Sequence, residues 1–146
     1  MKISDIMNPS PTTINRRARL CDAAALVSRT QVSDLMVIDD NGAFVGVLSE
    51  GDLIRAALPD YDELIQGDVP LHQVWRVFLE KGRELANRPI TPLIISSPIV
   101  LNPSDELLKA AASMINRQIR ILPVVTQGHL AGTISRGDLS NAILTQ

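Results

Sequence analysis

Hydrophobic and polar residues follow two periods along this chain, and each period occurs in both halves. Runs rich in β-branched residues, "LMVID" and "LPVVT", predict short strands, and "FVGVLS" and "LAGTIS" predict strands that return beside them. These four strands are expected at 35–39, 44–49, 122–126 and 130–135. Ala-rich stretches with apolar residues three and four apart predict amphipathic helices at 20–29 and 106–116, and closing helices begin near Gly51 and Gly137. Between the paired strands, Asn41-Gly42 predicts a hairpin turn more strongly than Gln127-Gly128 does.

The two halves are copies of one another. A shift of 87 residues places Ala23–Ala25 over Ala110–Ala112, and beyond the turn a shift of 86 places Gly51–Leu53 over Gly137–Leu139. One slip of a single residue, located in a turn, is what an internal duplication produces. With a brief extended run at 12–14 or 99–101, each copy reads β-α-β-β-α, which is a mixed α/β arrangement. Each copy is so small that it would be only marginally stable alone, and pairing the two copies would bury both sheets.

We expect three parts along the chain: the first repeat at 1–58, an inserted helical segment at 59–89, and the second repeat at 90–146. The inserted segment holds the only Trp and the only Tyr, and Leu71, Val74, Trp75, Phe78 and Leu85 fall near one helical face. Such a helix packs against its own module, or it forms a subunit contact or a lid over a pocket.

The motif Ser-x-Gly-Asp closes the last strand of each copy, at Ser49–Asp52 and Ser135–Asp138. Ser at the N-cap and an acid three residues later form a capping-box spacing, which is worth about 1 kcal/mol and is one sufficient explanation. The other explanation is chemical. Both copies have the shorter Asp where a capping box prefers Glu or Gln, and Gly lies just before it. A carboxylate beside bare backbone can accept two hydrogen bonds from a sugar diol, and a helix N-terminus favours phosphate.

Composition narrows the function classes. Net charge is −2 and one cysteine is present, which argues against a nucleic-acid partner and excludes an internal disulfide. Two His and one Cys give no zinc-ligand spacing, so no metal is expected. No signal peptide or membrane span is seen, and we expect a cytoplasmic protein. We find no Ser-His-Asp arrangement, Gly-rich phosphate loop or clustered His, so an enzyme is disfavoured and no obligatory cofactor is expected.

The order "DIM…SP.T…L.DAA.L…LMVID..G..VGVLS.GDL..A" resembles a CBS domain, named for cystathionine beta-synthase. The second copy, with "LPVV" and "GTISRGDL", is closer still, and two copies in tandem resemble a Bateman module. The resemblance implies CBS repeats packed through their sheets around a pseudo-two-fold axis. It also implies a regulatory module that binds adenine-containing ligands (AMP, ADP, ATP, NAD or S-adenosylmethionine) in the cleft between the copies. A disc-like homodimer and an unidentified effector protein are implied as partners, with signalling by a ligand-dependent change in the relative orientation of the repeats.

The resemblance also implies the binding residues. Ribose-binding carboxylates fall on Asp52 and Asp138, with hydroxyls at Ser49 and Ser135. The remaining implied positions are the adenine-contacting segments at Thr12, Thr13 and Ile14 and at Pro98, Ile99 and Val100, the walls of the base at Met36, Ile38, Pro123 and Val125, and the phosphate-facing Arg120.

The two copies differ in charge at two positions near the implied phosphate sites. Arg120 and Arg136 in the second copy correspond to Ser33 and Glu50 in the first. We therefore expect one stronger site for anionic nucleotides, drawing on both arginines, and we place it with Asp138 because of its proximity in sequence. The alternative function is a structural dimerisation module without a ligand, in which both motifs are helix caps only.

Overall fold

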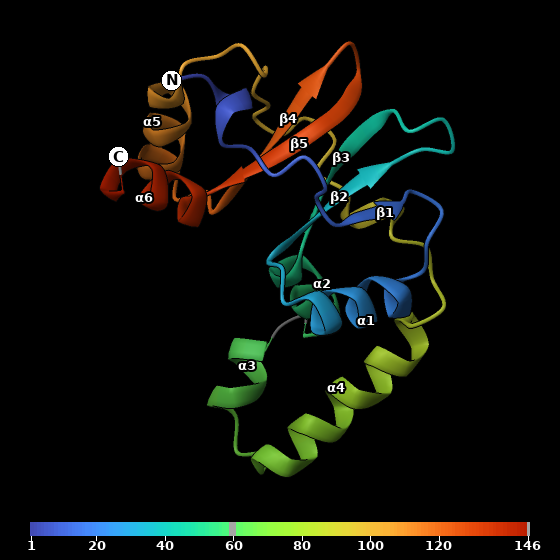
Figure 1. Ribbon diagram of the computed structural model, residues 1–146. Helices are drawn as coiled ribbons and strands as arrows, with labels where there is room; N and C mark the ends of the chain where they lie inside the picture. The colour runs from blue at the N-terminus through green and yellow to red at the C-terminus, as the bar shows by residue number, and fades with distance from the viewer. Residues whose placement is uncertain (59–60, 146) are drawn as a thin grey trace.

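The computed structural model describes residues 1–58 and 61–145. Pro59 and Asp60, where the expected helical segment begins, and Gln146, the last residue of the second expected repeat, lie outside the described residues. Figure 1 shows two small sheets in the middle of the molecule, with helices on their outer sides.

The first repeat contains a complete set of the expected elements. Its order is β1 (Thr13–Asn15), α1 (Leu20–Thr30), β2 (Asp34–Ile38), β3 (Phe44–Ser49) and α2 (Glu50–Ala57). The sheet order is β1-β2-β3, with β1 parallel to β2 and β3 antiparallel to it. Leu35, Val37 and Leu48 are fully buried beneath α1, because alternate strand residues face the helices.

The second repeat has α5 (Leu107–Arg117), β4 (Ile121–Thr126), β5 (His129–Ser135) and α6 (Arg136–Leu144). Its expected first strand at 99–101 is reduced to a single parallel bridge between Leu101 and Val124. The reason is Pro123. In the first repeat the Met36 amide donates to the Thr12 carbonyl over 3.2 Å, whereas Pro123 at the equivalent position has no N–H to donate to Ile99. The mixed α/β fold of two β-α-β-β-α repeats is thereby confirmed, with one strand shortened.

Both predicted hairpins form, and the one with the tighter turn lies in the second repeat. Gln127 and Gly128 are the only residues between β4 and β5, and both have positive φ, as a type I′ turn requires. The first repeat has a longer loop instead. There the Asp39 carboxylate accepts hydrogen bonds from the amides of Asn41 and Ala43, both at 2.9 Å, and only Gly42 has a positive φ.

Each repeat completes its core with a segment from the other half of the chain. The 3₁₀ turn η1 (Ile3–Asp5) packs on the second repeat, where Ile3 is fully buried with Leu101 and Leu122. The 3₁₀ turn η2 (Thr91–Leu93) follows Ile90, which is fully buried in the core of the first repeat. The two repeats are therefore joined by reciprocal exchange rather than by contact alone.

The exchange is two-fold symmetric at the level of single hydrogen bonds. Ile95 and Val47 exchange two backbone hydrogen bonds of 2.8 and 3.0 Å, and Asn8 and Thr133 exchange two of 2.8 and 3.0 Å. Glycine precedes each strand partner, at Gly46 and Gly132. A β-carbon there would collide with the carbonyl of Ile95 or Asn8. The sheets also meet directly, since Phe44 donates to the Gly128 carbonyl over 2.8 Å.

The inserted segment forms α3 (Tyr61–Gln66) and α4 (Leu71–Leu85), which lie below α1 and α2 in Figure 1. The predicted apolar face of α4 is only partly covered. Val74 and Phe78 are buried, with Phe78 9% exposed, whereas Trp75 is 59% exposed and Leu71 is exposed as well. The helix was correctly predicted. Phe78 is buried, whereas Trp75 stays mostly exposed at the cavity between α2 and α4.

We expect Gly132→Ala to lower the free energy of unfolding by about 1–3 kcal/mol, because the new methyl group has no space beside Asn8. Gly82→Ala is the matched control. Gly82 lies inside α4 with open space where a methyl group would be added, so the change should raise stability by about 0.5–1 kcal/mol. Urea unfolding of both variants measures this. Equal stability of Gly132→Ala and the parent protein would contradict the close strand-to-segment contact.

Candidate functional site

A cleft of about 280 Å³ lies where the exchanged segment meets both repeats. The first repeat contributes Asp34 and Val47 from β2 and β3. The second contributes the turn after α5 and the start of β4, and the chain between η2 and Leu101 closes the remaining side. The lining residues are Asp34, Val47, Ile95, Pro98, Ile99 and Gln118–Pro123. Four predicted site residues, Pro98, Ile99, Arg120 and Pro123, are thus brought together.

Pro123 leaves the carbonyl of one cleft-lining residue without its strand donor. Since Pro123 cannot donate to Ile99, the ladder bond that engages the equivalent Thr12 carbonyl in the first repeat cannot form here. The strand pairing resumes one step later, where Leu101 donates to the Pro123 carbonyl at 2.9 Å and accepts from Val125 at 2.8 Å. The Ile99 carbonyl therefore belongs to a residue that lines the cleft and lacks its strand donor.

Arg120 crosses from the second repeat to the first. Its guanidinium lies 3.6 Å from the carboxylate of Glu50, which is inside the first Ser-x-Gly-Asp motif. This differs from the expectation that Arg120 and Arg136 serve one anionic site beside Asp138. The exchange of segments brings opposite repeats together at this point, and distance along the sequence does not reveal that.

Arg136 lies elsewhere. Its guanidinium donates to the carbonyls of Ile119, at 2.9 Å, and Met114, at 3.3 Å, at the C-terminal end of α5. A cation there satisfies carbonyls that the helix leaves unpaired. Arg136 consequently fastens α6 to α5, and it is not among the residues that line the cleft.

Both Ser-x-Gly-Asp motifs cap helices. Ser49 Oγ accepts from the Asp52 amide and Ser135 Oγ accepts from the Asp138 amide, both at 3.1 Å. The second motif closes a full capping box, since Asp138 Oδ2 also accepts from the Ser135 amide at 2.7 Å. In the first motif the two carboxylate oxygens of Asp52 accept instead from Ser49 Oγ, at 2.9 Å, and from Arg55, at 2.6 Å.

The remaining predicted positions are spread along the first strands and their partners. Met36 is fully buried, while Thr12 and Ile38 are half-buried, and Thr13 and Val100 are exposed. Ile14 lies in the core of the first repeat. Val125 is partly buried and pairs with Leu101. None of these residues, all within the described part of the chain, lines the 280 Å³ cleft.

Sequence reasoning did not name Asp34 as a site residue, although among the described residues it is the one acid on the cleft wall. Its side chain is half-buried and accepts a hydrogen bond of 2.7 Å from the Ser33 hydroxyl. Burial raises the pKa of the Asp34 carboxyl, the Ser33 hydrogen bond and Arg120 oppose the rise, and Glu50 and Asp52 add to it. The sequence did contain a signal for this residue, because Asp34 is the only charged residue of a strand, β2, that is otherwise apolar.

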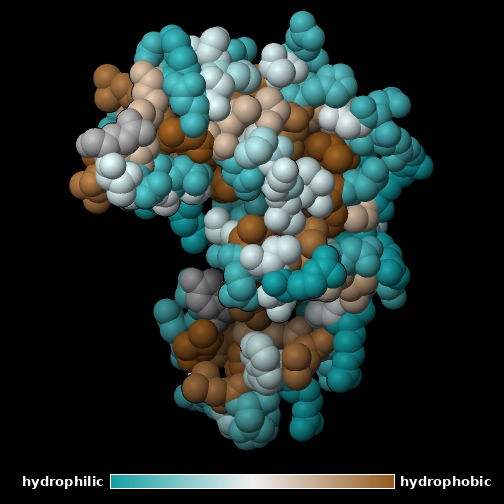
Figure 2. Space-filling model, in the orientation of Figure 1, coloured by the Kyte–Doolittle hydropathy of each residue, from teal (hydrophilic) through white to brown (hydrophobic). Residues whose placement is uncertain are grey.

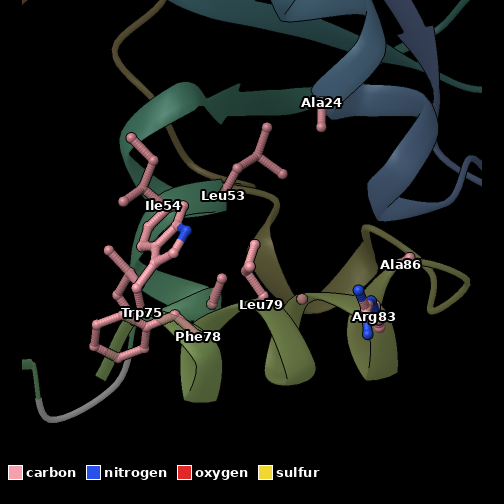
Figure 3. Close-up of a pocket in the computed structure, with 11 residues that line it drawn as sticks. Ala24, Leu53, Ile54, Trp75, Phe78, Leu79, Arg83 and Ala86 are labelled. Carbon is pink, nitrogen blue, oxygen red and sulfur yellow. The ribbon is translucent and has the colours of Figure 1, made fainter. Parts of the chain in front are cut away.

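A second cavity, of about 520 Å³, lies between α2 and α4. Its walls are almost wholly apolar, and Figure 3 shows Leu53 and Ile54 of α2 opposite the α4 side chains. Among the described residues, no group of His, Cys, Asp and Glu could hold a metal ion. In the same part of the chain, no helix is long and apolar enough to cross a membrane.

Comparison with known proteins identifies relatives over nearly the whole chain. The family model for the CBS domain matches residues 3–59 and 83–145. The protein MJ1426 of Methanocaldococcus jannaschii is 28% identical, over 99% of this chain and 92% of its own. The Arabidopsis thaliana protein CBSX2, a chloroplastic CBS domain-containing protein, is 31% identical over 97% of this chain, which spans 63% of that protein. A crystal structure of CBSX2 in complex with AMP has a TM-score of 0.75 at 28% identity, covering 99% of this chain and 96% of that one.

We expect Asp34→Asn to raise the free energy of unfolding at pH 7. A carboxyl whose pKa is raised by folding stabilises the protein most when protonated, and that contribution is lost as pH rises through the folded pKa. The gain of the variant should therefore vanish below about pH 3.9, where the acid is protonated in both states. Urea unfolding across this pH range measures it.

Ser33→Ala is the companion variant. It removes the hydrogen bond that favours the ionised form of Asp34, so stability at pH 7 should fall. An Asp34→Asn protein that is less stable than the parent at pH 7 would show that the carboxylate is satisfied in the fold.

Proposed function

The chain belongs to the CBS domain family, and from this premise we propose that it is a non-catalytic regulatory module that binds an adenine-containing nucleotide in the cleft between its repeats. The observation that carries the proposal is the wall of that cleft. It combines apolar side chains for the faces of a base with a backbone carbonyl, that of Ile99, which Pro123 deprives of its strand donor. The AMP complex of CBSX2 supports an adenine ligand for a protein of this fold.

Adenine suits these groups chemically. Its flat ring gains from burial between apolar walls such as Pro98 and Ile119, and its exocyclic amino group is a hydrogen-bond donor that matches the Ile99 carbonyl. An acceptor that lacks its strand donor favours a ligand that supplies a donor over a ligand of the same shape that does not. Guanine carries a carbonyl where adenine carries this amino group and should bind more weakly.

None of the Ser and Asp residues of the two Ser-x-Gly-Asp motifs is among the residues that line the cleft, so we propose that the sugar extends beyond that lining. Asp138 is our proposed ribose ligand, because its Oδ1 has no hydrogen-bond donor among the described residues while Oδ2 serves the cap. Asp52, Ser49 and Ser135 have the same proposed role with fewer free atoms. Arg120 lines the cleft, and it bridges the repeats through Glu50.

Regulation follows from the exchange of segments. A ligand in this cleft would contact Val47 of the first repeat and the start of β4 in the second, and so would favour one relative orientation of the two. An effector protein that distinguishes the orientations completes the proposal, together with a cytoplasmic location. The second candidate, a structural module without a ligand, is supported by the caps at Ser49 and Ser135, which explain both motifs without a ligand.

We expect AMP to stabilise the protein, since a ligand at about 100 times its Kd adds about 2.7 kcal/mol and shifts Tm by about 5–10 °C for a chain of this size. Pro123→Val restores an amide that can bond to Ile99. The loss of one hydrogen bond to the ligand should weaken AMP binding about 2–10-fold. Pro92→Val, which alters a proline outside the cleft, is the control. Calorimetric titration compares the three proteins.

A Tm that AMP, ADP, ATP, NAD and S-adenosylmethionine all leave unchanged at millimolar concentration would favour the module without a ligand. Tight binding of AMP to Pro123→Val would instead keep the function and contradict the assignment of the Ile99 carbonyl.

We also propose a homodimer. Two helical faces leave large apolar side chains in water, and Figure 2 shows hydrophobic residues gathered where α2 and α4 lie in Figure 1. The exposed residues are Ile54, Trp75 and Leu79 around the first-repeat groove and Leu108, Ile115, Ile143 and Leu144 on α5 and α6. Apolar patches of this kind mark interaction sites, and two-fold dimers are the commonest assemblies. One helix of each face is equivalent in the two repeats, α2 in the first and α6 in the second, and this supports a partner that is itself this duplicated chain.

We expect Ile54→Glu to convert the protein to a monomer, because it places a charge in the apolar groove between α2 and α4. Val77→Glu is the matched control: Ile54 is 57% exposed and Val77 is 51% exposed, but Val77 does not line the groove. Light scattering after gel filtration measures the mass of each. A monomeric parent protein would refute the homodimer, and a dimeric Ile54→Glu would place the interface on another face.

A further inference from the structure

The charges around the cleft point to a narrower class of ligand than the family's adenine compounds as a whole. Asp34 and Arg120 are the ionisable side chains on its walls. Two further carboxylates, Glu50 and Asp52, lie close enough to act on Asp34, and Arg55 is the second cation of the group. Three carboxylates thus face two guanidiniums, which leaves the group with a net negative charge.

Neither guanidinium is free for a phosphate. Arg55 is bound to Asp52 over 2.6 Å, and Arg120 is paired with Glu50 over 3.6 Å. A phosphate that recruits Arg120 must separate it from Glu50 and then stay beside that carboxylate. Like charges at such distances disfavour each other.

The other sources of positive potential are also occupied. The N-termini of α2 and α6, which would favour phosphate, are capped by Ser49 and Ser135 and carry Asp52 and Asp138 in their first turns. Arg136 is held by the carbonyls at the end of α5. The half-buried Asp34 carboxylate receives a hydrogen bond from Ser33 and has no ion-pair partner within 4 Å among the described residues.

We infer that the cleft selects adenosine derivatives with a neutral or positively charged 5′ substituent, such as a thioether or a sulfonium with an ammonium group, over adenosine di- and triphosphates. This inference rests on the proposed function and specifies its ligand. A cationic substituent would supply Asp34 with the partner that the protein does not provide, and it would leave the Arg120–Glu50 pair intact. A polyphosphate adds several negative charges to a group that is already negative.

The experiment is a calorimetric titration of the protein with S-adenosylmethionine, adenosine, AMP and ATP at constant ionic strength and without divalent cations. We expect S-adenosylmethionine to bind at least tenfold more tightly than ATP, with AMP between them. In Asp34→Asn and in Glu50→Gln the preference for S-adenosylmethionine over ATP, measured as the ratio of their Kd values, should decrease at least about fivefold. Glu63→Gln, which removes an exposed acid of α3 away from the cleft, should leave the ratio unchanged.

Binding of ATP as tight as that of S-adenosylmethionine would overturn the inference and leave the proposed function standing. The same holds for a ratio that neither Asp34→Asn nor Glu50→Gln alters. If none of the four compounds binds, the proposed function fails together with the inference. The use of two separate variants protects the test against a folding defect in either one.

Discussion

The reciprocal burial of Ile3 and Ile90 is the contact on which the rest of the structure depends. Each isoleucine is fully buried in the repeat to which it does not belong by sequence, so neither core is complete without the other half of the chain. Removing a buried isoleucine from such a core typically costs about 2–5 kcal/mol. Two such contacts therefore stabilise the relative arrangement of the repeats more than the single hydrogen bond between their hairpins, from the Phe44 amide to the Gly128 carbonyl, could.

That exchange also builds the cleft. After Ile90 the chain must return to the second repeat, and the paired hydrogen bonds between Ile95 and Val47 fix its path across β3. Pro98 and Ile99 follow at once, opposite Pro123. The site is thus a consequence of how the cores are completed, and a ligand bound there acts on the same segment that joins the repeats.

Local features of this architecture could be predicted from the sequence, and features that join the two halves could not. Helices α1 and α5, the paired strands and the caps at Ser49 and Ser135 depend on residues near one another in the chain. The Arg120–Glu50 pair depends on the exchange, which no periodicity encodes. Both hairpin turns were predicted, but the one with the better composition, Asn41-Gly42, is the looser of the two, because Asp39 stabilises a longer loop there. Conversely, the effect of Pro123 was readable in principle, since a proline inside one of two duplicated strands must remove a hydrogen bond from that copy alone.

Capping and ligand binding need not exclude each other at the Ser-x-Gly-Asp motifs, and the two copies differ in how far they combine. Asp52 uses both carboxylate oxygens within the first repeat, for Ser49 and Arg55, so a ligand there would have to break an ion pair. Asp138 satisfies its cap with Oδ2 alone. One carboxylate oxygen can accept the capping hydrogen bonds at the start of α6 while the other remains without a donor. The motif therefore caps a helix in both repeats, and only in the second does one carboxylate oxygen, Asp138 Oδ1, have no hydrogen-bond donor among the described residues.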